Sequence, residues 1–396
     1  MSAVLILMND YGGYAFPVEL SLELIKRGYS ILHVYTSASG SPTAAFPSGT
    51  AGFESIDIDL MPVQKDNFFQ RWKNERQYGA KVAAIIRERN PAMVISANTP
   101  LEAQKQIMGA CQIIHAKFIY WLQDFLSIAA KRVLSKKLGA LGALAGFYFS
   151  YIEKKLLRQS DAIVVIADAF AAFLQKWRID NKSIFVIPNW APIEYIPVRN
   201  KINDFSRQYG IDEKFVVLYS GTMGMKQNPD IVVQAALELA ARSEIVFVVI
   251  SNGVGMDYLK QKKLEHKLDN LLLLPLQPFR RISDCLASAD VGLVLLDADA
   301  GDYCVPSKLW SIFCSQRAAL LVVPTSNLAA HVTKTQDAGI VLEPHDAAKL
   351  AATVLQLSSQ PDLLKTMGKN GRAFAENNFR IKSIADQFEE VIKSVN

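Results

Sequence analysis

Short runs of apolar residues alternate along the chain with longer stretches in which apolar residues recur at helical spacing. Buried strands of a parallel sheet have such continuous apolar runs, and the stretches between them are typical of crossover helices. The pattern therefore predicts two series of βαβ units, each of about five strands. The expected strands are residues 4–8, 31–36, 93–96, 118–122 and 162–166 in the first series and 215–219, 245–250, 271–274, 291–296 and 319–323 in the second.

Two prolines mark the expected boundary between the halves. Pro188 and Pro192 interrupt both a strand ladder and a helix, and a polar segment follows them. We expect one Rossmann-like domain over residues 1–192 and a second over residues 193–376, as the length of 396 residues also favours. Residues 377–396 carry apolar side chains at near-helical spacing and predict an amphipathic helix. The pattern does not say which half this helix covers, and we assign it to the N-terminal domain as a hypothesis.

Composition narrows the class of protein. Half of the residues are hydrophobic and a fifth are charged, as in globular proteins. The net charge of +5 suits a phosphate-bearing ligand or an anionic surface and does not predict nucleic-acid binding. The four cysteines form no CxxC pair and no metal-ligand cluster, so we expect reduced thiols and no metal site. The N-terminus is typical of a first strand rather than a signal peptide, and no apolar run reaches about 18 residues. We therefore expect a cytoplasmic protein.

Glycine-containing loops follow the first predicted strand of each half. Open α/β sheets bind ligands at the carboxyl ends of their strands, where glycine lets the backbone approach a ligand closely. In the first half, Gly12 and Gly13 follow Asp10 and Tyr11. A tight strand-to-helix turn explains these glycines equally well. The absence of a full GxGxxG fingerprint argues against a dinucleotide dehydrogenase.

Two segments of the second half have residues suited to phosphate. They are YSGTMGMK at 219–226 and VPSKLW at 305–310, and each leads into a predicted helix. Lysine ammonium groups and the amides at a helix start both attract phosphate. Lys226 and Lys308 therefore predict a diphosphate site in this half.

Several short motifs occur in a characteristic order along the chain. They are GG at 12–13, IPNW at 187–190, YSGTMGMK at 219–226, PSKL at 306–309 and AGIVLEPHD at 338–346. Together they resemble the bacterial GT4-type glycosyltransferases, and within these the colanic-acid and O-antigen branch, over nearly the whole chain. The resemblance implies a GT-B fold, in which two Rossmann-like domains face a cleft and a C-terminal helix crosses over. It also implies that the N-terminal half binds the acceptor and the C-terminal half binds the donor.

The resemblance further implies a retaining hexosyltransferase that needs no metal or cofactor. Its donor would be a UDP- or GDP-linked sugar, and its acceptor a hydroxyl of a lipid-linked saccharide in surface polysaccharide biosynthesis. Carried over by position, Lys226 and Lys308 would hold the leaving diphosphate and act as catalytic residues. The donor-binding residues implied are Gly12, Gly13, Gly221, Thr222, Lys226, Gln277, Pro278, Pro306, Ser307, Lys308 and Ser311.

The chain departs from the family pattern in the second half. The family's two glutamates, eight positions apart, correspond to Tyr303 and Ser311, and Asp302 is an alternative for the first. Met223 stands where the family often has arginine. The chain must therefore recognise the sugar and the ribose by other groups, so the identity of the donor stays open.

The acceptor site is expected at the end of another strand of the first half. Gln123 and Asp124 follow that strand and join Asp10 and Tyr11 as acceptor-binding candidates. Asp124 would orient or deprotonate the acceptor hydroxyl as a catalytic residue, or else cap the helix that follows. We expect structural positions, and neither catalysis nor metal binding, for the five histidines and the DAD segment at 297–299.

The stretch around residues 126–157 is apolar, contains glycine and is basic. Its basic residues are Lys131, Arg132, Lys136, Lys137, Lys154, Lys155 and Arg158. An amphipathic surface of this kind can lie on anionic lipid, here the inner face of the cytoplasmic membrane, and would bring the enzyme to a polyprenyl-diphosphate acceptor. The alternative is a helix pair whose apolar side belongs to the core.

Two other classes of function stay open from the sequence. The missing glutamates suggest a non-catalytic binding subunit that kept the fold and binds a donor without transferring its sugar. A nucleotide-sugar epimerase of the same shape would instead release free nucleotide and an epimerised sugar without an acceptor.

Overall fold

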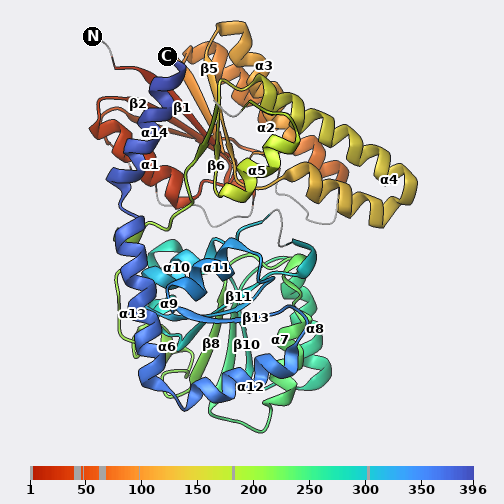
Figure 1. Ribbon diagram of the computed structural model, residues 1–396, viewed down its shortest axis with the longest axis vertical. Coiled ribbons are helices and arrows are strands. Elements are labelled where there is room, and N and C mark those ends of the chain that lie inside the picture. The colour runs from red at the N-terminus through yellow and green to blue at the C-terminus, as the bar shows by residue number, and fades with distance from the viewer. Residues whose placement is uncertain are drawn as a thin grey trace. The chain divides into compact units, whose positions relative to one another are not determined.

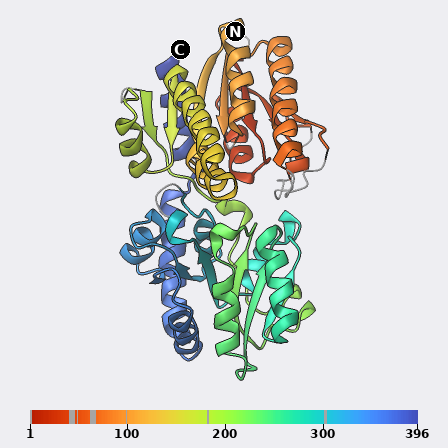
Figure 2. The same ribbon diagram turned by 90° about the vertical axis from the view of Figure 1, so that its right-hand side faces the viewer.

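The computed structural model describes residues 3–39, 46–47, 49–61, 68–97, 99–180, 183–300 and 304–396. The chain forms two compact units, Met1–Asn189 with Ile381–Asn396, and Trp190–Arg380. Each unit has one parallel β-sheet covered by helices (Figure 1; Figure 2 turns the view by 90°). The predicted α/β class with two doubly wound parallel sheets is confirmed.

The first unit has a seven-stranded sheet of order β3-β2-β1-β4-β5-β6-β7. Its strands are β1 (Leu5–Asp10), β2 (Ser30–Tyr35), β3 (Phe53–Asp57), β4 (Met93–Ala97), β5 (Lys117–Leu122), β6 (Ala162–Val165) and β7 (Ile184–Val186). Its helices are α1 (Ala15–Lys26), α2 (Phe68–Arg89), α3 (Leu101–Ile114), α4 (Leu126–Gln159), α5 (Asp168–Lys176) and α14 (Ile381–Val395). Because β1 pairs with β2 on one side and β4 on the other, its side chains are buried from Ile6 onward.

The second unit has a six-stranded sheet of order β10-β9-β8-β11-β12-β13. Its strands are β8 (Phe215–Ser220), β9 (Ile245–Ile250), β10 (Leu271–Leu274), β11 (Val291–Leu295), β12 (Ala318–Val322) and β13 (Gly339–Leu342). Its α-helices are α6 (Asp204–Gln208), α7 (Asp230–Glu238), α8 (Val254–His266), α9 (Ile282–Ala287), α10 (Lys308–Cys314), α11 (Leu328–Thr335), α12 (Ala347–Ser358) and α13 (Pro361–Asn378).

All ten strands predicted from apolar runs are present, and three further strands lie at sheet edges. The additional strands are β3, β7 and β13. An edge strand has a neighbour on one side only, and the residues of β3 and β7 are exposed or half-buried. The sequence of β3 has no continuous apolar run, and β7 and β13 are short, with three and four residues.

The C-terminal helix α14 belongs to the first unit, where it packs beside α1 (Figure 1). Arg27, which follows α1, donates to the carboxylates of Asp386 and Glu389 at 2.7 Å each. The ring of Phe388 lies 4.8 Å from that of Trp121 on β5. The apolar stripe of this amphipathic helix is buried against the first unit. Its polar face forms ion pairs with Arg27.

Helix α4 is a hairpin of two helical arms. The chain turns at Gly139, whose φ of 57° and ψ of −129° are not helical. The arms pack so closely that a Cβ on Gly142 would collide with the carbonyl of Leu134, and one on Gly146 would lie 2.8 Å from Cα of Lys131. Both close approaches require glycine.

Candidate functional site

The loop that follows β8 is held in place by hydrogen bonds from neighbouring segments. Gly221 has a φ of +120°, and its carbonyl accepts from the hydroxyl of Ser251 at 2.8 Å. The N–H of Met223 donates to the carbonyl of Asn252 at 3.0 Å. The N–H of Gly224 donates to the side chain of Gln227 at 2.7 Å. The loop therefore presents the next element, the 3-10 turn η4 (Met225–Gln227), in a defined position.

Lys308, the first residue of α10, lies over this loop. Its Nζ is 5.0 Å from the ring centre of Tyr219 and 3.5 Å from the carbonyl of Thr222. Burial and, to a smaller extent, the charge of Lys226 lower the pKa of Lys308 to about 8, whereas Cys304 opposes the shift. Among the residues that the structure describes, no carboxylate forms an ion pair with Lys308.

Lys226 lies on η4 with an exposed side chain. Its Nζ is 3.6 Å from Sγ of Cys304, and its carbonyl accepts from the N–H of Asp297 at 2.8 Å. Both ammonium groups thus lie beside the loop that follows β8, and the charge of Lys226 acts on Lys308. Such a pair of like charges is unfavourable when no ligand is bound. A dianionic or trianionic ligand would relieve that repulsion, which makes this place a candidate anion site.

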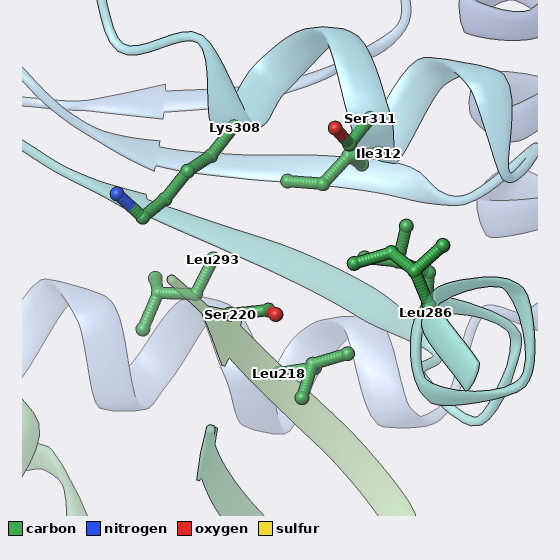
Figure 3. Close-up of a pocket in the computed structure, with 8 residues that line it drawn as sticks. Leu218, Ser220, Leu286, Leu293, Lys308, Ser311 and Ile312 are labelled. Atoms are coloured by element: carbon green, nitrogen blue, oxygen red, sulfur yellow. The ribbon is translucent and has the colours of Figure 1, made fainter. Parts of the chain in front are cut away.

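A niche of about 50 Å³ adjoins Lys308 (Figure 3). Its lining residues are Leu218, Ser220, Ile282, Leu286, Leu293, Lys308, Ser311 and Ile312. Figure 3 shows the hydroxyls of Ser220 and Ser311 bordering an otherwise apolar wall. Within the described chain neither hydroxyl hydrogen-bonds to another side chain, so both can contact a ligand or water. The volume suffices for a few water molecules.

The other predicted donor residues lie at different distances from this cluster. Pro306 is half-buried and Ser307 is exposed, and both directly precede Lys308. Gln277 and Pro278 follow β10, which β9 separates from β8, and the Gln277 amide donates to the carbonyl of Pro275 at 2.9 Å. The structure thus brings Gly221, Thr222, Lys226, Lys308 and Ser311 together, and places Gln277 and Pro278 farther along the sheet edge.

In the first unit, the Asp10 carboxylate accepts hydrogen bonds from the loop that follows β1. It accepts from the N–H of Tyr14 at 2.6 Å and from that of Gly12 at 3.4 Å. Burial raises the pKa of Asp10 to about 7, although these two N–H groups lower it. A Cβ on Gly12 would collide with the ring of Tyr14, and Gly13 has a φ of 63°. The tight strand-to-helix turn therefore explains why both positions are glycine.

Tyr11 and Gln123 also have contacts within the first unit. The ring of Tyr11 packs edge-on at 4.8 Å from Tyr78, and burial raises the pKa of Tyr11 to about 12. The carbonyl oxygen of the Gln123 side chain accepts from the amide of Asn189 at 3.3 Å. Both predicted acceptor residues are thus held by neighbouring side chains.

Asp124 directly precedes the cap position of the helix after it. The cap residue of α4 is Phe125, and the N–H of Leu126 donates to the carboxylate of Glu153 at 3.0 Å. Glu153 also accepts from the hydroxyl of Ser127 at 2.5 Å. Burial, with a smaller contribution from the charge of Asp124, raises the pKa of Glu153 to about 7, although hydrogen bonds from Ser127 and Leu126 oppose the shift. Sequence reasoning missed Glu153 because it caps a helix start 27 residues earlier, across the hairpin.

Comparison with known proteins finds similar glycosyltransferases. Residues 15–195 match the family model described as Glycosyltransferase Family 4. A colanic acid biosynthesis glycosyl transferase of Escherichia coli, WcaI, is 26% identical over 324 residues, which are 81% of this chain and 74% of that protein. The chain is similar to the GT4-type glycosyltransferases.

Further proteins are similar to the chain. N-acetyl-alpha-D-glucosaminyl L-malate synthase of Bacillus anthracis is 23% identical over 253 residues, 60% of this chain and 61% of that one. Anabaena Alr3699/HepE, solved with UDP and glucose, matches with a TM-score of 0.72 and 15% identity over 99% of this chain and 100% of that chain. WaaG, a glycosyltransferase involved in lipopolysaccharide biosynthesis, matches with a TM-score of 0.67 and 15% identity over 96% of this chain and 98% of that chain. These neighbours show that the fold is GT-B.

The departures from the GT4 sequence pattern have a partial structural explanation. Met223 is fully buried in the core of the second unit, so its side chain faces away from a ligand. Ser311 lines the niche beside Lys308. Tyr303 and Asp302 lie outside the described residues. Within the described chain, no helix is both long and apolar enough to cross a bilayer.

Proposed function

We propose that the second unit binds a nucleotide-diphosphate sugar and that the chain transfers its hexose, with retention, to a hydroxyl of a lipid-linked saccharide. The observation that carries this proposal is the convergence of Lys226 and Lys308 at the carboxyl end of β8. A diphosphate gains negative charge as the glycosidic bond breaks. Two ammonium groups held beside it would stabilise that charge more in the transition state than in the ground state.

The proposed reaction needs no protein nucleophile. The bond between the sugar C1 and the diphosphate oxygen breaks, and the acceptor oxygen bonds to C1 on the same face. The acceptor proton passes to the leaving phosphate oxygen, with Asp124 orienting the acceptor hydroxyl. Ser220 and Ser311, which line the niche, would contact the nucleoside side of the donor through their hydroxyls or through water in the niche. No metal or cofactor is required in this scheme.

The relatives support the substrate class. One is described as acting in colanic acid biosynthesis and another in lipopolysaccharide biosynthesis, which supports a role in surface polysaccharide assembly. HepE was solved with UDP-glucose and with UDP and glucose. UDP-linked sugars are therefore the first donors to test, followed by GDP-linked sugars.

The α4 hairpin supports a peripheral contact with the inner face of the cytoplasmic membrane. Its second arm exposes five large apolar side chains, named here the hairpin surface: Leu141, Leu144, Phe147, Tyr148 and Tyr151. Residues 126–159 contain seven Lys or Arg and one acidic residue, Glu153, which is buried. Apolar side chains flanked by basic ones suit a bilayer with anionic lipid. The core-facing side of the hairpin is formed by other residues, among them Leu134 and Ile152.

Thermal stabilisation by nucleotides tests the donor site. The melting temperature would be measured with UDP, GDP, ADP and NAD for the wild type, Lys226→Ala, Lys308→Ala and the control Lys260→Ala, an exposed lysine on α8. We expect a shift with one nucleotide family that the first two substitutions abolish and the control retains. No shift with any nucleotide would overturn the donor site. A shift without transfer would favour the binding subunit, and an epimerised sugar without an acceptor would favour the epimerase.

A further inference from the structure

Three loops at the carboxyl ends of the second sheet meet at the imidazole of His345. Nδ1 of His345 lies 3.2 Å from the amide nitrogen of Asn228, and Nε2 lies 3.2 Å from a carboxylate oxygen of Asp297. A neutral imidazole with its proton on Nε2 satisfies both contacts, because it accepts from Asn228 and donates to Asp297. Asn228 follows η4, Asp297 follows β11 and His345 follows β13. We call the three side chains the imidazole clamp.

One member of the imidazole clamp contacts the backbone of Lys226. Asp297 donates its backbone N–H to the carbonyl of Lys226 at 2.8 Å while its side chain meets His345. Asn228, two residues after Lys226, ends η4 in a left-handed conformation with a φ of 45°. The backbone of Lys226 is thus held directly by one member of the clamp and followed closely by another.

The imidazole clamp would oppose the repulsion between the ammonium groups of Lys226 and Lys308. The charge of Lys226 is close enough to lower the pKa of Lys308, so the two ammonium groups repel each other when no anion is bound. Like charges move apart if the chain that carries them can shift. A clamp on the backbone of Lys226 keeps the pair converged before the ligand arrives, which lowers the cost of ordering the site on binding.

The backbone of His345 is also unusual. Its φ of 72° is in the left-handed region, which a residue with a Cβ occupies only with backbone strain. Glycine would adopt this conformation without strain. The histidine side chain therefore contributes something that the local backbone does not need.

We propose that His345 is a positioning residue that holds the Lys226 loop for diphosphate binding. It acts through Asp297 and Asn228 and does not itself touch the donor. The proposal rests on the proposed function, since it assumes that Lys226 binds the donor diphosphate.

A double-mutant cycle on the full chain tests the clamp. The dissociation constant would be measured by calorimetry for the nucleoside diphosphate, among UDP, GDP and ADP, that the wild type binds most tightly. We expect His345→Gly to weaken binding about tenfold. We expect its melting temperature to stay the same or rise, since glycine relieves the positive φ. His345→Gln should restore much of the affinity, because its amide can donate to one partner and accept from the other.

The Lys226→Ala background separates a positioning role from a structural one. There, His345→Gly should have no further effect, because the residue it positions is gone. Full wild-type affinity in His345→Gly, with weakened binding in Lys226→Ala, would overturn the clamp and leave the donor site intact. An equal loss in both backgrounds would likewise show that His345 acts independently of Lys226. Unchanged binding in Lys226→Ala would overturn the donor site itself.

Discussion

A Cβ atom on Gly221 would lie 2.8 Å from Cε of Lys308, so the lysine stem occupies space that only glycine leaves free. The same glycine has a φ of +120°, which side chains rarely adopt. One residue thus serves both the turn after β8 and the placement of an ammonium group. The first prediction follows from this pair.

Gly221→Ala should lower nucleotide affinity by displacing Lys308. We expect a loss of about tenfold, since the charge moves away from the diphosphate. The control is Gly210→Ala, which also places a Cβ at positive φ (+63°) but meets nothing within 4 Å. Both variants should lose stability through backbone strain, and only Gly221→Ala should lose affinity in a calorimetric titration. Equal affinities in the two variants would contradict the contact.

Nucleotide binding should weaken as pH rises through about 8. The pKa of Lys308 is lowered to about 8, so its charge is complete below that pH and lost above it. An anionic ligand favours the charged form, and binding is therefore linked to proton uptake at Lys308. We expect the dissociation constant to rise by up to about tenfold per pH unit above pH 8. Lys308→Arg should flatten this dependence because a guanidinium keeps its charge. A wild-type profile as flat as that of the variant would refute the linkage.

The hairpin surface should carry binding to anionic vesicles. Leu144→Asp with Phe147→Glu should reduce cosedimentation with vesicles of phosphatidylcholine and phosphatidylglycerol by about tenfold or more, because two apolar anchors are lost and two negative charges are gained. The matched control is Leu264→Asp, an exposed leucine on α8 of the second unit. Binding of the wild type should also fall at high salt. Equal binding by the double variant and the control would count against the hairpin.

The two hairpin arms should depend on glycine where they cross. Gly142→Ala places a Cβ against the carbonyl of Leu134 and should destabilise the first unit by about 1–3 kcal/mol. Gly109→Ala is the control, because that glycine lies within α3 with nothing in reach of a new Cβ. Alanine there should stabilise the chain by about 0.5–1 kcal/mol. Denaturant unfolding of both variants would check the opposite signs, and a neutral Gly142→Ala would mean that the arms can separate.

Local patterns in the sequence determined the fold class and much of the candidate donor site. Ten strands could be predicted because a strand buried on both faces needs a continuous apolar run. Lys226 and Lys308 could be singled out because glycine and lysine beside a strand end are a local signal for phosphate. The edge strand β3 could not, since one open side removes the need for that run.

Tertiary structure decided which distant residues meet. The helix start after Asp124 is capped by Glu153, and the loop that carries Lys226 is joined through Asp297 to His345. Neither partner has a sequence signal, because such contacts depend on chain segments far apart that only the packed sheets and the hairpin bring within hydrogen-bond distance. For the same reason the burial of Met223, where the family often has arginine, is visible only in the folded core. Periodicity specifies the elements of this protein, whereas the positions of its charges depend on how those elements pack.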